Sequence, residues 1–226
     1  MPVYLLPEEP VFPPPSEAEP DGLLAIGGDL SPERLLKSYT EGIFPWFRDE
    51  DDLFWFSPDP RLVLYPDEIK ISSSLHRLIK GGKFKVSTDT AFEQVIQACA
   101  DAPRKGQDGS WIDQDFINAY TRLHRLGFAH SFETFYNDEL IGGLYGVSIG
   151  RAFFGESMFH KVNNASKVAF VYLVMKIKTW QFHFIDCQVE TDLLTGLGAK
   201  PVPRTEYLKR LKTAVGFPSQ KGKWTL

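Results

Sequence analysis

The chain of 226 residues is 43% apolar and 14% aromatic, enough to bury a substantial core in one large domain or in a large domain with a small partner. No apolar stretch approaches the roughly 20 residues that cross a bilayer, and the acidic, proline-rich N-terminus lacks the regions of a signal peptide, so we expect no membrane association and a cytoplasmic location. The net charge of −4 argues against coating nucleic acid through overall attraction.

The first part of the chain predicts a small N-terminal domain. Proline and glutamate dominate residues 7–20, so this segment should form an extended arm. A helix follows, with Ser31 as its N-cap, a proline in its first turn and Gly42 at its end. We therefore expect a small domain at residues 1–60 and a catalytic domain at residues 61–226.

A basic segment near the start of the second domain contrasts with the acidic chain. Residues 69–85 contain five basic and no acidic residues, whereas residues 49–52 are all acidic. Such segregation leaves room for a local phosphate-binding face on an acidic protein. A solvated surface helix is the alternative that charge alone leaves open. The basic residues are Lys70, Arg77, Lys80, Lys83 and Lys85.

Two helices are expected next, and both should pack on the sheet that follows them. The first is indicated by Asp89 and by an apolar face that reaches Cys99. The second covers residues 113–126 and ends at Gly127.

A three-stranded antiparallel meander is predicted for residues 128–159, with turns at residues 137–138 and 149–150. Asn163 or Asn164 then caps a long helix, which connects the meander to the next strand.

The next strand, residues 182–189, is apolar, as is typical of a strand that pairs in parallel with its neighbour after a crossover. A helix near Thr191 and a helix capped by Thr205 complete the chain. In this order of elements the strands come first and a helical crossover comes late, which indicates an α+β fold with a sheet like that of an acyltransferase.

Asp186 and Gln188 are the main candidates for a polar site. The two-residue period of a strand puts them on one face, with Cys187 on the other. An acid and an amide on a strand built for burial are unfavourable unless hydrogen-bonded, which makes them site candidates. A buried pair that only satisfies backbone groups is the alternative. Cys99 and Cys187 have no Cys or His partner at metal spacing, so both are expected to be buried thiols, without disulfide, zinc or nucleophilic role.

Other polar and aromatic residues adjoin this strand or turns. Glu156 lies among aromatic and apolar residues of a predicted strand, so it is either paired with a cation or exposed at the end of the strand. Trp46, Trp55 and Trp111 adjoin turn residues, which suits stacking on a base, although core packing is the default for each of them singly. The chain has no phosphate-binding loop of the Walker type, so nucleoside triphosphate chemistry has no support.

Six sequence motifs occur in order along most of the chain, and residues beyond about 203 add none. They are GLLAIGGDLSPERLL (residues 22–36), GIFPWF (42–47), WFSPDPR (55–61), GESMF (155–159), NASK (164–167) and IDCQ (185–188). Together they resemble the leucyl/phenylalanyl-tRNA-protein transferase family. The resemblance implies a small N-terminal domain joined to an N-acetyltransferase-like domain with a mixed sheet and a crossover helix. It also implies transfer of leucine or phenylalanine from aminoacyl-tRNA to the N-terminal Arg or Lys of acceptor proteins, which marks them for degradation through the N-end rule.

The resemblance also implies roles for individual residues. Asp186 and Gln188 would lie at the reacting centre and Glu156 on the acceptor side, and the 3′-terminal adenosine would be surrounded by Trp46, Trp111 and Tyr120. For the donor side chain we expect an apolar pocket lined by Leu144, Phe153, Met158, Phe170 and Ile185. For phosphates of the tRNA acceptor stem we expect contacts from Arg77, Lys80, Lys83 and Lys85. Family members commonly carry methionine where this chain has Leu144, and asparagine where it has Thr191.

The expected partners are tRNAs charged with leucine, phenylalanine or methionine and proteins with N-terminal Arg or Lys, bound by a monomer that needs no metal and no diffusible cofactor. An acetyl-CoA-dependent N-acetyltransferase is the alternative enzyme. It would need a pyrophosphate-binding glycine turn before the crossover helix, and residues 161–165 contain no glycine. A tRNA-binding module without catalytic activity is the third hypothesis.

Overall fold

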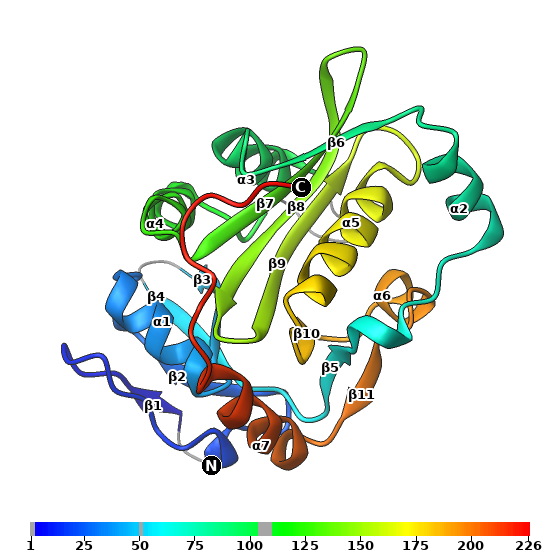
Figure 1. Cartoon of the computed structure of the whole chain (residues 1–226). Helices are drawn as coiled ribbons and strands as arrows, with labels where there is room; N and C mark the ends of the chain where they lie inside the picture. The colour runs from blue at the N-terminus through cyan, green and yellow to red at the C-terminus, as the bar shows by residue number, and fades with distance from the viewer. Residues whose placement is uncertain (1–2, 50–51, 104–109) are drawn as a thin grey trace.

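The computed structural model describes residues 3–49, 52–103 and 110–226, and these residues form two β-sheets surrounded by helices (Figure 1). Residues 50 and 51 of the acidic run therefore lie outside the described residues. No helix in the described part of the chain is long and apolar enough to cross a membrane.

The smaller sheet belongs to the N-terminal unit and has the strand order β1-β2-β4-β3. Its first pair is parallel and the other two pairs are antiparallel. Helix α1 (Pro32–Thr40) contacts β3 on one side and parts of the larger unit on the other. The strands are β1 (Tyr4–Leu5), β2 (Leu23–Ile26), β3 (Phe44–Asp49) and β4 (Asp52–Phe56), and a 3-10 turn, η1 (Pro15–Glu17), lies between β1 and β2.

The larger sheet is seven-stranded and mixed, in the order β11-β5-β10-β9-β8-β7-β6. Among its described strands β9 and β10 pair in parallel, and the other neighbouring strands pair antiparallel. The predicted meander is thus β7-β8-β9, and the predicted crossover leads from β9 to β10. The strands are β5 (Arg61–Leu64), β6 (Lys85–Thr88), β7 (Ala129–Tyr136), β8 (Glu139–Ile149), β9 (Ala152–His160), β10 (Phe184–Gln188) and β11 (Lys200–Val202).

Helices cover both faces of the larger sheet (Figure 1). The crossover helix α5 (Ala165–Thr179) packs on β7 and β8, where a Cβ on Gly142 would lie 2.6 Å from the Cβ of Ala165, so only glycine permits this approach. On the other face α3 (Phe92–Asp101) contacts both of these strands and α4 (Gln114–Arg125) contacts β7. The remaining elements are η2 (Pro66–Glu68), α2 (Ser73–Lys80), α6 (Asp192–Gly196) and α7 (Arg204–Val215).

Two apolar clusters follow from this layering. One lies between the sheet and α5. The other covers the opposite face and continues into the small sheet, so the two units share a core. The ring centroids of Tyr39 on α1 and Phe154 on β9 are 5.0 Å apart across this shared core.

Several local signals in the sequence predicted the elements correctly. The side chains of Ser31, Asp113 and Thr191 each accept a hydrogen bond from a backbone N–H in the first turn of their helix. Residues 137–138 form the first meander turn with positive φ angles of 50° and 60°. The second turn falls one residue later than expected, at residues 150–151, because β8 extends through Ile149.

At three predicted helix starts the residue that marked the start makes no side-chain capping bond, although Asn164 does hold the N-cap position of α5. Asp89 does not cap a helix, because its carboxylate accepts a hydrogen bond from the backbone N–H of Ser131 on β7 and α3 begins only at Phe92. Asn164 precedes α5 with a left-handed φ of 67° and makes no side-chain cap. Thr205 lies inside α7, which begins one residue earlier after a proline.

Candidate functional site

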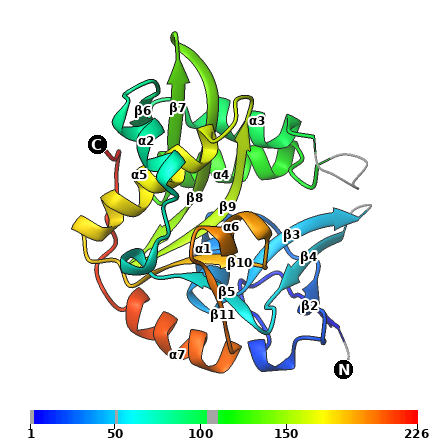
Figure 2. The same ribbon diagram turned by 90° about the vertical axis from the view of Figure 1, so that its right-hand side faces the viewer.

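The site is a cavity of about 470 Å³ that opens where β9 and β10 separate. The two strands pair in parallel only as far as Phe154 and Asp186, and β9 continues to His160 without β10 beside it. Figure 2 shows β9, β10, α6 and β3 converging in this part of the molecule. A cavity of this size fits a small-molecule group such as an amino-acid side chain with part of a nucleoside. Its lining consists of Trp46, Trp111, Leu144, Tyr145, Phe153, Gly155, Glu156, Ser157, Met158, Phe170, Leu173, Ile185, Cys187, Gln188, Val189, Thr191, Leu193 and Leu194.

Most of the cavity wall is apolar. The five residues predicted for a donor side chain, which are Leu144, Phe153, Met158, Phe170 and Ile185, all line it together. Sequence reasoning missed Leu173 on α5 and the two leucines of α6, because a short helix after the strand gave no sign of folding back over the cavity. Cys187 also lines the wall, but burial raises the pKa of its thiol far above the ordinary value, so it stays protonated and unreactive.

The polar end of the cavity is built around the carboxylate of Glu156. Its Oε1 accepts hydrogen bonds from the Tyr39 hydroxyl at 2.7 Å and from the Gln188 Nε2 at 2.9 Å. Its Oε2 accepts from the Tyr120 hydroxyl at 2.8 Å, and the two tyrosine hydroxyls also contact each other. A glutamate with these partners is neither exposed nor paired with a cation, so both sequence-based expectations for Glu156 are wrong.

Burial raises the pKa of Glu156 to about 7, in spite of the hydrogen bonds from Tyr39 and Tyr120, which lower it. The negative charge of Asp186 raises the pKa further. Burial also raises the pKa values of Tyr39 and Tyr120 well above the ordinary value, so both remain hydroxyl donors. The cavity therefore ends on a carboxylate that changes its charge near neutral pH.

Asp186 is fully buried and does not line the cavity. Arg61 on β5 binds it with two hydrogen bonds, from Nε to Oδ1 at 2.8 Å and from Nη2 to Oδ2 at 2.7 Å. The Tyr207 hydroxyl on α7 donates to Oδ2 at 2.7 Å. The guanidinium also lies 4.6 Å from the ring centroid of Phe44 and 4.9 Å from that of Tyr207. Asp186 is therefore half of a buried, well-bonded ion pair.

Asp186 reaches Gln188 through the backbone. Its Oδ1 accepts from the Gln188 backbone N–H at 2.9 Å, whereas the amide side chain of Gln188 donates to Glu156. Gln188 has a left-handed φ of 61°, and the register with β5 shifts between the two residues. The strand alternation assumed from the sequence is thus broken at this point, and the carboxylate holds the turn that aims the Gln188 side chain at Glu156.

The three tryptophans have different positions. Trp46 and Trp111 line the cavity. Trp55 does not: it is fully buried, its Nε1 donates to the carbonyl of Gly27, and its ring packs on Phe12. Tyr120 is buried behind Glu156 and does not line the cavity either.

Arg61, Tyr39 and Tyr207 are further site residues that sequence reasoning missed. Arg61 ends the WFSPDPR motif, which was the one available signal, but nothing local pairs it with a carboxylate 125 residues away. Among the described residues no group of three or more His, Cys, Asp or Glu side chains could hold a metal ion.

The basic segment forms an exposed surface on α2, the loop after it and the start of β6. The Lys83 ammonium lies 5.0 Å from the ring centroid of Tyr136 on β7. Within the part of the chain that the structure describes, the four cations of this surface make no ion pair with a carboxylate. They are Arg77, Lys80, Lys83 and Lys85.

The apolar cavity ends on a partly buried carboxylate and amide, has two tryptophans beside it and, among the described residues, no activated nucleophile. This arrangement fits an α+β enzyme of the acyl-transfer class that aligns two substrates directly. Two family models cover most of the chain. The leucyl/phenylalanyl-tRNA protein transferase N-terminal domain matches residues 28–59, and leucyl/phenylalanyl-tRNA protein transferase matches residues 63–212. The chain belongs to this family.

Similar proteins agree with this assignment. The chain is 55% identical to the leucyl/phenylalanyl-tRNA–protein transferase of Anaeromyxobacter sp. (strain Fw109-5), over 100% of this chain and 96% of that protein. It is 52% identical to the protein of the same name from Nitrosospira multiformis, over 97% of this chain and 95% of that protein. Among solved structures, L-PGS from Bacillus licheniformis has a TM-score of 0.41 and 11% identity, covering 75% of this chain and 54% of that chain, which is too distant to assign a fold family.

Proposed function

We propose that this protein transfers leucine or phenylalanine from a charged tRNA to the N-terminal Arg or Lys of acceptor proteins, and so prepares them for degradation. The observation that carries the proposal is the cavity itself, because its apolar wall ends directly on Glu156 and Gln188. When an apolar donor side chain packs against this wall, the ester carbonyl of the donor lies near the side chains of Glu156 and Gln188. Membership of the family supports the same reaction.

On the donor side, Trp46 and Trp111 are suited to stack on the terminal adenosine at the mouth of the cavity. Tyr120 supports the site indirectly through its hydrogen bond to Glu156. Leucine, phenylalanine and methionine are unbranched at Cβ, so each can enter a narrow apolar wall. Valine and isoleucine carry a second substituent at Cβ, and their shape should hinder entry.

On the acceptor side, the ionised carboxylate of Glu156 attracts a cationic N-terminal side chain. Arg and Lys bring such a charge, whereas alanine does not and glutamate brings the opposite one. An α-amine with a pKa of roughly 7.7 to 8 is partly neutral at cellular pH and can act as the nucleophile. The same carboxylate can therefore select the acceptor and hold its amine beside the ester.

In the reaction the amine nitrogen forms a bond to the ester carbonyl carbon, and the bond from that carbon to the ribose oxygen breaks. A proton from the amine is transferred to the ribose oxygen, which leaves as a hydroxyl. Gln188 donates through Nε2 to Glu156, so its Oε1 is the atom that can accept a hydrogen bond from the amine. Asp186 and Arg61 act as positioning residues, because they hold the backbone of Gln188 and do not line the cavity. An activated ester needs no covalent enzyme intermediate.

The finer features of the fold and the surface belong to the same proposal. The parallel β9-α5-β10 crossover next to an antiparallel meander supports an N-acetyltransferase-like catalytic domain beginning near residue 61, after a small N-terminal domain at residues 1–60. The basic surface on α2 and β6 would bind phosphates of the acceptor stem. We further propose that the protein acts as a cytoplasmic monomer.

The test is incubation with leucyl-tRNA and four peptides that differ only in their first residue, Arg, Lys, Ala or Glu, followed by mass spectrometry. The Arg and Lys peptides should gain one leucine and the others should not. Equal transfer to the Ala peptide would refute the acceptor rule. A parallel incubation with acetyl-CoA should leave all four peptides unchanged, and binding of tRNA without transfer would indicate a module that is not an enzyme.

A further inference from the structure

The tail after α7, residues 216–226, returns across the larger sheet toward β7 and β8 (Figure 1). Trp224, two residues before the end of this tail, is only 3% exposed. The backbone N–H of Trp224 donates to Oδ2 of Asp89 at 2.7 Å, and its Nε1 donates to the carbonyl of Gln220 at 2.9 Å. The Ser219 hydroxyl accepts from the backbone N–H of Gly150 at 2.9 Å. Several separate contacts therefore fix this tail.

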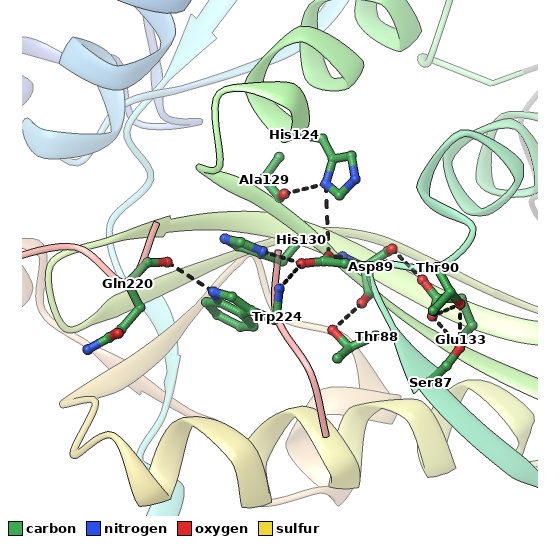
Figure 3. A network of polar contacts seen from close by, with 11 residues as sticks. Ser87, Thr88, Asp89, Thr90, His124, Ala129, His130, Glu133, Gln220 and Trp224 are labelled. Carbon is green, nitrogen blue, oxygen red and sulfur yellow. Dashed lines mark hydrogen bonds and ion pairs between the residues drawn. The ribbon is translucent and has the colours of Figure 1, made fainter. Parts of the chain in front are cut away.

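The anchor for Trp224 is a buried polar network at the ends of β6 and β7 (Figure 3). Asp89 also binds the Nδ1 of His130 at 2.8 Å and the backbone N–H of Ser131 at 2.9 Å. The His130 ring stacks on the Trp224 ring, with centroids 3.8 Å apart and planes 12° apart. Burial lowers the pKa of His130, so a neutral imidazole stacks on the indole. This network determines where the indole lies.

The indole of Trp224 packs against the wall of the cavity without lining it. Its ring centroid lies 6.1 Å from that of Phe153, which does line the cavity. It lies 6.3 Å from that of Phe132, the partner of the cavity residue Leu144 across β7 and β8. On another side the ring of Trp180 packs edge-on at 4.8 Å. Trp224 thus packs on Phe153, a ring that lines the cavity, without lining the cavity itself.

We propose that Trp224 is a specificity-determining positioning residue that sets the size of the donor cavity by holding the ring of Phe153. The proposal rests on the proposed function of the cavity as the site for the donor side chain. Interiors are close-packed, so removal of the indole leaves a void into which neighbouring rings relax. A retreat of Phe153 enlarges the cavity, which weakens contacts with leucine and makes room for a larger side chain.

The experiment compares kcat/KM for phenylalanyl-tRNA and leucyl-tRNA in the wild type, Trp224→Ala and Trp224→Phe. For Trp224→Ala we expect the ratio of phenylalanine to leucine transfer to rise on the order of tenfold, the range over which an apolar pocket discriminates small size differences. Trp224→Phe keeps an aromatic ring and should fold, and its ratio should rise by roughly threefold, since the void is smaller. Leu24→Ala, a buried change in the small sheet, is the control for lost stability and should leave the ratio unchanged.

A ratio that stays at the wild-type value in both Trp224 variants, or one that shifts equally in Leu24→Ala, would overturn the inference while the proposed function stands. If Trp224→Ala fails to fold, the ratio in Trp224→Phe decides the question alone. A wild type that transfers neither amino acid would overturn the proposed function and the inference with it.

Discussion

Replacement of Glu156 by glutamine should make the protein more stable at neutral and alkaline pH. The folded structure raises the pKa of this carboxyl from the ordinary 4.5 to about 7, which corresponds to about 3 kcal/mol against the ionised form. The folded protein therefore holds the proton more tightly than the unfolded chain does. The penalty is absent below pH 4.5, grows between pH 4.5 and 7 and is complete above pH 7. Glutamine carries no charge and avoids this penalty.

Urea unfolding at pH 5, 6, 7 and 8 measures the effect. We expect Glu156→Gln to exceed the wild type by up to about 3 kcal/mol at pH 8 and by little at pH 5, since glutamine still offers a carbonyl acceptor and an amide donor to the surrounding hydroxyls. Glu139→Gln changes an exposed glutamate and controls for the loss of a negative charge. A stability difference that does not depend on pH, or a variant that is less stable at pH 8, would mean that the folded protein does not disfavour the ionised form of Glu156.

Three further substitutions test the buried ion pair, the polar end of the cavity and the basic surface. Arg61→Ala leaves Asp186 as an unpaired buried charge and should lower the free energy of unfolding by about 3–5 kcal/mol, measured by urea denaturation; a loss below 1 kcal/mol would contradict the buried pair. Gln188→Ala should lower turnover by about 10² to 10⁴ and leave the circular dichroism spectrum intact; a folded variant with wild-type turnover would make Gln188 structural only. Lys83→Ala should flatten the slope of log affinity for tRNA against log salt by about one unit; an unchanged slope would mean that the basic surface is only solvated.

Local signals account for most of the elements that the sequence predicted correctly. Ser31, Asp113 and Thr191 cap helices because each side chain reaches a backbone N–H within its own first turn. The meander follows from strand periodicity and from a turn whose residues tolerate positive φ. The five apolar residues of the cavity could be assigned because all of them are apolar and lie on the predicted strands and helix around one site, although only Met158 and Ile185 belong to the family motifs.

The features that the sequence did not predict depend on contacts between residues far apart in the chain. Asp186 looked like a group facing the substrate, but Arg61 binds it from another strand and removes it from the cavity. Asp89 looked like a helix cap, but its partners lie on β7 and at the end of the tail. Trp55 packs on residues of the N-terminal arm. In each case the competing partner is a tertiary one, which neither periodicity nor propensity reveals.

We expect the cavity to accept an apolar side chain that is unbranched at Cβ and to deliver its ester to an amine beside Glu156. This can be measured as single-turnover transfer of radiolabelled amino acid to a peptide beginning with Arg, with leucyl-tRNA and valyl-tRNA compared side by side. Leucine should be transferred rapidly and valine more slowly by roughly tenfold or more, the discrimination available to an apolar cavity. Equal rates for the two donors, or no label on the peptide from either, would contradict this expectation.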